Sequence, residues 1–427
     1  MIRSKCPNGV TITEFIKHRY GRLCHACVGI MVVFYMSITY ISELTALGST
    51  LTATYGLNST IPIILTTLVT TLYTGRVQGW SIIVLIIIAI VTIFSSVKID
   101  TKNIDESGLL KPSRIAIESF YVLTAACTGA NLFHQGYWQR VYSSKSNRDL
   151  IIGLLIASVL ILSTFSVLGF TGIIAIWGNL CCSNEVEYNN VFFSLTKTQR
   201  GWINILVLIL VVSLVCSCTD TIQIGLSATI VNDVFNNKIN IHYARICVVL
   251  LTIPIVIVAT KNVDIMRLFL IADLYSTIVA TIVVIAFIDR FKKYKTTKIL
   301  KDSTKTLVDE KEIGIVVDSS DVTKKEQKSQ ETIENEIEGE PRNFYINGYD
   351  CVVGMIVGIL AIVIFGWMFH KDLKKGISLL LLPDGMSIEG ESLGAFLAAP
   401  LGTLFGMFLS ASIRMLINQT FLNKKEN

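Results

Sequence analysis

A run of polar side chains interrupts apolar sequence between residues 118 and 145. It places four polar groups within about two helical turns: Asn131, His134, Gln135 and Tyr137. A charged group at the centre of a membrane-spanning helix costs about 2.5–3.5 kcal/mol, so polar groups at that depth usually face a bundle interior, a water-filled cavity or a bound solute. We therefore expect a broken helix between Gly129 and Gly136, with these four residues binding a small polar solute.

His134 is the only histidine in the interior of an expected span, because the other four lie at span ends or in loops. No second histidine or cysteine stands at the spacing of a metal site, so we expect none there. Asn131 precedes His134 by three residues and shares its helix face. The pair suits either hydrogen bonding to a solute or a polar contact between helices, and the sequence leaves both readings open.

A second polar stretch, residues 216–233, carries hydroxyls and one carboxylate inside an apolar segment: Ser217, Asp220, Thr221 and Ser227. Sodium prefers oxygen ligands, including carbonyls that broken helices release. Ser and Thr in membrane helices also bond their own backbone or join neighbouring helices. Both interpretations stay open, and we expect a second break around residues 217–221 if the ion site exists.

Two further carboxylates, Glu43 and Asp273, lie inside expected spans. The cost of desolvating a charge makes each a candidate functional group. Glu43 has no evident partner in the sequence. Asp273 suits helix packing as well as solute contact.

Other chemistries have no support in the sequence. There is no nucleophile–base constellation and no glycine-rich phosphate loop, so we expect neither an enzyme nor a cofactor, and no nucleotide or nucleic acid as partner. The net charge of +5 comes from Lys and Arg placed mostly beside apolar segments, where positive charge sets membrane orientation. Cys24 and Cys27 begin an apolar helix, which favours small buried residues over redox or metal chemistry.

The composition is that of a membrane protein. The 427 residues are 52% hydrophobic with mean hydropathy +0.60, and only 16% are charged, compared with about 25% in soluble domains. Apolar runs recur near the ~20 residues that cross a bilayer as a helix. The sequence predicts an all-α polytopic protein with about ten spans: 23–56, 59–75, 79–97, 116–140, 150–178, 202–230, 243–260, 266–289, 350–370 and 393–417.

The domain organisation follows from these spans. Basic clusters at 3–22, 140–148 and 290–298 fall on one side, which predicts that both termini are cytoplasmic. We expect a cytoplasmic segment 1–22, a core of about eight helices at 23–290, two further helices in 346–418, and a tail at 419–427. The charged segment 291–345 is predicted to be a disordered cytoplasmic loop, because it has too little apolar surface to fold alone.

Several short motifs resemble the sodium:solute symporter family in its fungal form. WQRVYSSKS at 138–146 is similar to its Gln-Arg…Ala-Ala-Lys-Ser signature. SCTDT at 217–221 resembles its Ser-Thr-x-Asp-Ser motif, and ITEFIKHRYG at 12–21 and LFLIADL at 268–274 resemble its third and tenth core helices. The motifs occur in the family's order across most of the chain.

The resemblance implies an inverted five-plus-five helix repeat, with substrate and sodium near the midplane and the plasma membrane as location. It implies that Ser217 and Asp220 belong to the sodium site, and it places Cys218 where the family usually has Thr or Ser. Asn131, His134, Gln135 and Tyr137 would line the substrate cavity. The leading expectation is a sodium- or proton-coupled symporter of a small polar solute, with His134 or Asp220 as the proton group.

The chain also departs from the family. If 23–56 is the third core helix, the first two have no counterpart, and the Gly-Gly…Thr-Asp…Gln stretch is replaced by LYTGRVQGWS. The alternative expectation is therefore a truncated or degenerate membrane protein that does not transport and acts as a sensor, scaffold or remnant.

Overall fold

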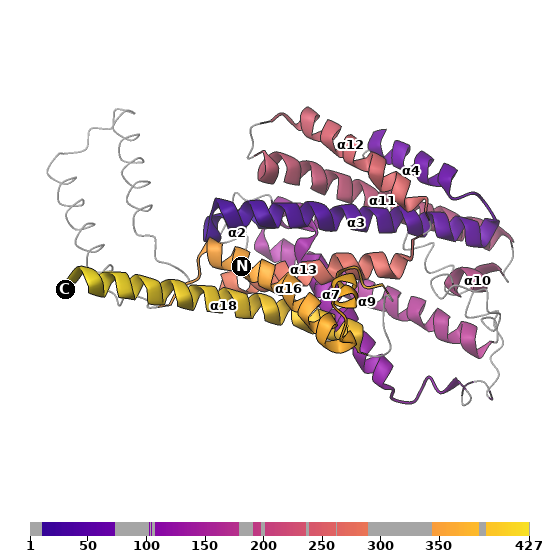
Figure 1. Cartoon of the computed structure of the whole chain (residues 1–427). Coiled ribbons are helices and arrows are strands. Elements are labelled where there is room, and N and C mark those ends of the chain that lie inside the picture. Colours follow the sequence, from indigo (N-terminus) through magenta and orange to yellow (C-terminus); the bar gives the residue numbers. More distant parts are fainter. Residues whose placement is uncertain are drawn as a thin grey trace, which may run out of the picture.

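The computed structural model describes residues 11–72, 102, 104, 107–178, 191–197, 201–235, 239–261, 263–288, 344–383 and 390–426. Within these ranges every regular element is a helix (Figure 1). The elements are α2 (Ile12–Tyr20), α3 (Arg22–Tyr55), α4 (Thr60–Leu72), α7 (Arg114–Phe133), α8 (Gln135–Ser143), α9 (Asn147–Trp177), α10 (Val191–Lys197), α11 (Gly201–Thr229), π-helix η2 (Ile230–Val234), α12 (Ile241–Ala259), α13 (Ile265–Phe287), α16 (Gly348–His370), α17 (Leu373–Ser378), 3₁₀-helix η4 (Leu379–Leu381) and α18 (Glu391–Glu426).

Eight helices in the described part of the chain are long and apolar enough to cross a membrane: α3, α7, α9, α11 with η2, α12, α13, α16 and α18. Each overlaps an expected span, so the predicted all-α polytopic architecture is confirmed. Within the expected span 59–75, the structure describes α4 as far as Leu72, and residues 73–75 lie outside the described residues. The expected span 79–97 and residues 291–343 of the expected loop lie outside the described residues.

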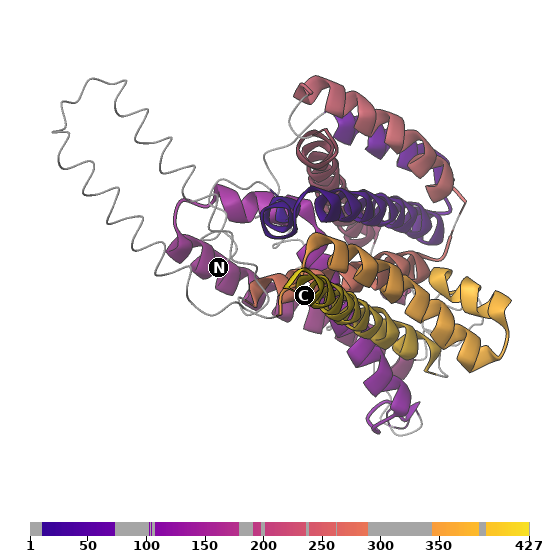
Figure 2. The same cartoon turned by 60° about the vertical axis from the view of Figure 1, so that its left-hand side comes forward.

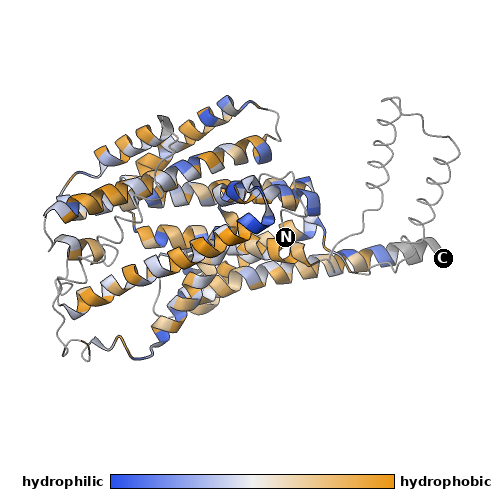
Figure 3. Cartoon of the chain, turned by 180° about the vertical axis from the view of Figure 1, so that it is seen from behind, coloured by the Kyte–Doolittle hydropathy of each residue, from blue (hydrophilic) through white to orange (hydrophobic). Residues whose placement is uncertain are grey.

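Large apolar side chains cover the outside of the bundle. On α9, Ile156, Leu162 and Phe165 are 57%, 70% and 69% exposed, and Figure 3 shows hydrophobic colour along the outer helices. A soluble monomer rarely exposes a continuous apolar patch of this kind. The exposed side chains instead match the hydrocarbon that surrounds a spanning helix.

Helix α3 is the central element of the bundle. It packs against α11 and α12 on one side and against α13 and α16 on the other (Figures 1 and 2). Met36, Tyr40 and Leu44 on α3 have no exposed surface. Gly56 ends the helix in a left-handed conformation, with φ 66°, where glycine has no steric penalty.

The expected N-terminal segment contains a packed helix. Helix α2 buries Ile12, Phe15 and Ile16, and the Phe15 ring stacks on Phe287 of α13 with centroids 5.3 Å apart. Gly21, with φ 90°, then turns the chain into α3. At the other end, α18 runs without interruption to Glu426 through the expected tail.

Two pairs of glycines bring α16 and α18 into close contact. Gly354 and Gly358 lie four residues apart on α16, and Gly402 and Gly406 do so on α18. A Cβ on Gly358 would overlap Thr403 Oγ1 and lie 3.0 Å from the Ala399 carbonyl oxygen. Small residues at this spacing allow helices in membranes to associate through van der Waals contact.

We expect Gly358→Leu to separate α16 from α18 and to lower the thermal stability of the detergent-solubilised protein. Overpacking of a tight interface costs about 1–3 kcal/mol. The measurement is a melting curve followed by fluorescence-detected size exclusion. Gly169→Leu on α9 is the matched control, because nothing lies within 4 Å of a Cβ at Gly169. Equal melting of both variants would contradict the assigned contact.

Candidate functional site

The polar run contains a helix break, as the sequence predicts. Helix α7 ends at Phe133, His134 is extended with φ −71° and ψ 99°, and α8 begins at Gln135. A break releases backbone carbonyls that require new donors. The indole Nε1 of Trp138 supplies one by donating to the Leu132 carbonyl oxygen at 2.8 Å.

The break packs directly on α11. A Cβ on Gly136 would overlap the Thr221 side chain and lie 3.0 Å from the Thr221 carbonyl oxygen. A Cβ on Gly225 would lie 3.2 Å from the Gly136 nitrogen. Arg140 Nη2 also donates to Thr221 Oγ1 at 3.0 Å. The structure therefore brings together the two polar stretches identified in the sequence.

Two buried polar atoms at the break have no hydrogen-bond partner among the described residues: His134 Nδ1 and Gln135 Nε2. Gln135 is fully buried, and its Oε1 accepts from the Ile12 backbone nitrogen at 3.3 Å. The His134 ring stacks on Tyr137 with centroids 4.2 Å apart. A buried polar atom left unpaired costs about 1–3 kcal/mol. The break therefore holds two buried polar atoms whose hydrogen-bonding capacity the described residues leave unused.

The four predicted solute-binding residues do not all converge. His134, Gln135 and Tyr137 lie together at the break. The exposed side chain of Asn131 donates instead to the Cys127 carbonyl oxygen of its own helix at 2.8 Å. Because α7 ends at Phe133, Asn131 and His134 do not belong to one continuous helix, and their shared role in binding a solute stays a prediction.

The expected break around residues 217–221 is wrong. Helix α11 is continuous from Gly201 to Thr229, and its irregular turn is the π-helix at Ile230–Val234. Thr219 and Thr221 donate to the carbonyl oxygens of Val215 and Ser217, at 2.9 and 2.8 Å. These hydroxyls are used within the helix, which is the alternative that the sequence left open.

Three residues were expected to hold sodium: Ser217, Cys218 and Asp220. On the regular helix α11, Ser217 and Asp220 are three residues apart and share a face, whereas Cys218 is turned by about 100° from Ser217. The described residues contain no group of three or more His, Cys, Asp or Glu side chains that could hold a metal ion.

Glu43 and Asp273, the two further carboxylates that the sequence singled out, lie on helices that pack near the break. Glu43 on α3 is hydrogen-bonded to the Cys218 thiol of α11, a partner that the sequence did not reveal. Asp273 on α13 is 9% exposed and lies within electrostatic range of the Tyr35 hydroxyl and the Cys127 thiol. No hydrogen bond or ion pair reaches the Asp273 carboxylate from the described residues.

A buried cluster that sequence reasoning missed ties the first helices to the end of α11. His25 Nε2 lies 3.1 Å from Asp233 Oδ1, and Thr11 Oγ1 donates to the same oxygen at 3.4 Å. With the Ile12–Gln135 bond, this cluster holds α2 against both the break and η2. The available signal was Asp233 itself, an acidic residue that closes an apolar segment.

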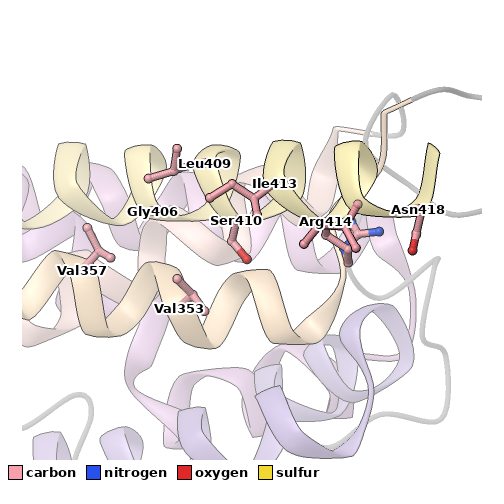
Figure 4. A pocket seen from close by; sticks show the side chains of 9 residues that line it. Val353, Val357, Gly406, Leu409, Ser410, Ile413, Arg414 and Asn418 are labelled. Carbon is pink, nitrogen blue, oxygen red and sulfur yellow. The ribbon is translucent and has the colours of Figure 1, made fainter. Parts of the chain in front are cut away.

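A groove of about 350 Å³ lies elsewhere, between α16 and α18 (Figure 4). Val353, Val357, Leu409 and Ile413 form its apolar wall. The charge of Arg414 at its end is already paired, because Arg414 Nη2 lies 2.9 Å from Asp350 Oδ2. Its lining residues are separate from those at the break.

A comparison with curated proteins finds a similar transporter. The chain is 29% identical to the spermidine transporter DUR31 of Candida albicans, over an alignment that covers 98% of this chain and 73% of that protein. No protein-family model matches the chain. With the eight apolar helices, this similarity supports a multi-pass membrane transporter.

Because the Cys218 side chain is exposed, its reactivity can show whether the helix surface beside the break meets water or lipid. Its side chain is exposed on a spanning helix, so it faces either water or lipid. We expect a single-cysteine variant that retains Cys218 to react with a charged, membrane-impermeant thiol reagent. A variant that retains only Cys351, which is fully buried, serves as the control. Reaction of Cys218 with a lipid-soluble maleimide alone would show that this face meets lipid.

Proposed function

We propose that the chain is a secondary transporter that takes up a small polar solute, of the amine class to which spermidine belongs, in symport with sodium or protons. The helix break at His134 is the observation that carries the proposal. It supplies buried, unpaired hydrogen-bonding atoms in a bundle core, where transporters of the broken-helix type bind solutes. The similarity to a spermidine transporter supports the solute class.

The proposed solute site consists of His134, Gln135 and Tyr137, with Asn131 at its margin. His134 Nδ1 and Gln135 Nε2 would bond the solute, and the Tyr137 ring would cover it. Rocking of the helices around the break would alternate access between the two sides. We place this transporter in the plasma membrane with both termini in the cytoplasm, as the basic clusters indicate.

The coupling ion is proposed in two versions. In the sodium version, Ser217 and Asp220 contribute oxygen ligands, and Cys218 adds little because a thiol is a poor sodium ligand. In the proton version, His134 or Asp220 carries the proton. No other cofactor is required by either version.

We expect His134→Ala to raise the half-saturating concentration for spermidine uptake by about five- to tenfold, because one buried hydrogen bond contributes about 1–1.5 kcal/mol. Labelled uptake in cells that lack their own polyamine carriers is the measurement. Thr124→Ala on α7 is the control with little expected effect, since its exposed hydroxyl donates to the Phe120 carbonyl oxygen of its own helix. Unchanged uptake by His134→Ala at equal surface expression would remove the site from the proposal.

Replacing sodium with an impermeant organic cation at fixed pH separates the two coupling versions. The sodium version predicts that uptake stops, and that Ser217→Ala raises the sodium concentration required. The proton version predicts that uptake persists without sodium and stops when a protonophore collapses the proton gradient. Full uptake under both treatments would exclude coupling to either ion.

A further inference from the structure

We propose that Asp273 and Glu43 form two anionic subsites, one on each side of the helix break, that bind separate ammonium groups of an elongated amine. The inference rests on the proposed function and names the residues that would select its substrate. It concerns side chains outside the polar run itself.

Among the buried acidic side chains of the described residues, Asp273 alone has no basic side chain beside it. The four others are Glu118, Asp233, Asp350 and Glu391. Each has a basic partner within 3.1 Å: Arg114, His25, Arg414 and His370 respectively. Asp273 is buried to the same degree and has no such partner within the described ranges. An uncompensated carboxylate in a protein core is strongly unfavourable, so a cation that binds there gains affinity by pairing with it.

The position of Asp273 is at the meeting of three helices near the break. Gly129 of α7 approaches α13 so closely that a Cβ would overlap Ser276 Oγ, one turn beyond Asp273. From α3, Tyr35 presents its hydroxyl within electrostatic range of the carboxylate. The Tyr35 ring also meets Phe133, the last residue of α7, edge to face at 5.7 Å.

Glu43 of α3 lies beside Cys218 of α11. Its carboxyl bonds the Cys218 thiol and lies within electrostatic range of Tyr137. A neutral thiol does not compensate the charge, and no ion pair to Glu43 occurs among the described residues. Arg140, which bonds Thr221, is also within electrostatic range of Tyr137 and Cys218. Glu43 should therefore be the weaker of the two subsites.

A tyrosine lies within electrostatic range of each carboxylate. Tyr35 lies near Asp273, Tyr137 lies near Glu43, and the two hydroxyls are within electrostatic range of each other. Tyr35 and Glu43 are eight residues apart on α3, which separates them by about 12 Å along the helix axis. Tyrosine faces attract ammonium groups. Two separated acids, each with a tyrosine within electrostatic range, fit an extended diamine or triamine better than a compact amine or a neutral solute.

The test is uptake of labelled spermidine with competition by butylamine, putrescine and 1,8-diaminooctane. In the wild type, we expect 1,8-diaminooctane to compete at least tenfold better than butylamine. Asp273→Asn should raise the half-saturating spermidine concentration at least tenfold and abolish this preference. Glu43→Gln should raise it several-fold. Asp264→Asn is the matched control, because Asn can still cap the start of the same helix.

The outcomes separate the two proposals. If the wild type accumulates no amine above cells without the protein, the proposed function fails. If the wild type accumulates spermidine but Asp273→Asn and Glu43→Gln keep its affinity and its preference for long diamines, the subsites are wrong.

A labelling experiment on the wild-type protein tests the subsites even where a variant does not reach the membrane. Spermidine should protect the carboxyl groups of Asp273 and Glu43 from modification by a hydrophobic carbodiimide, measured by mass spectrometry, whereas butylamine should not. Equal modification with and without spermidine would overturn the inference.

Discussion

Backbone hydrogen bonding at the break between α7 and α8 is the constraint on which the site depends. Hydrocarbon offers no hydrogen bonds, so irregular backbone in a membrane requires protein or water partners. The Trp138 indole supplies a donor from the following helix. The glycines at 136 and 225 let α11 approach the turn closely. The break is thus held by side chains on both of its flanks, while His134 Nδ1 and Gln135 Nε2 stay unpaired.

The distribution of charge separates supporting contacts from candidate binding groups. Asp350 and Arg414 hold α16 to α18, and His25 and Asp233 hold the start of α3 to η2. Each of these buried carboxylates therefore has a basic side chain beside it. Asp273 sits in the same low-dielectric environment without a pair. The free-energy cost of burying this unpaired carboxylate would be offset by a cation that pairs with it. This connects the position of Asp273 with the proposed amine substrate.

Helix α3 relates these features to one another. Its Tyr35 lies near Asp273, its Glu43 bonds Cys218, and its Met36 contacts the region where Gly225 meets the break. A single rigid helix therefore sets the separation of the two carboxylates. Helix α2, joined to α3 through Gly21, reaches back to Gln135 and Asp233. A movement of α3 relative to α7 and α11 would change both ends of the site together.

Much of this organisation could be predicted from local sequence. Spans such as 150–178 and 266–289 follow from long apolar runs, because the bilayer fixes both the length and the polarity of a helix that crosses it. The break at His134 was predictable for the same reason: polar side chains flanked by glycines are costly inside a continuous lipid-facing helix. The prediction of a second break was wrong because the threonines of α11 donate to backbone carbonyl oxygens of the same helix. A sequence that contains hydroxyls does not show which acceptor each hydroxyl will use.

The sequence by itself determined that this is an all-helical membrane protein and that polar chemistry lies near residue 134. Hydrophobicity and span length are local properties, and they are sufficient for both conclusions. Only the tertiary structure decided that Cys218 is the partner of Glu43, that Asp233 meets His25, and that Asp273 has no basic partner among the described residues. These relations join residues that are far apart in the chain, and they depend on how helices rotate and pack, which the hydrophobic pattern of a single helix leaves undetermined.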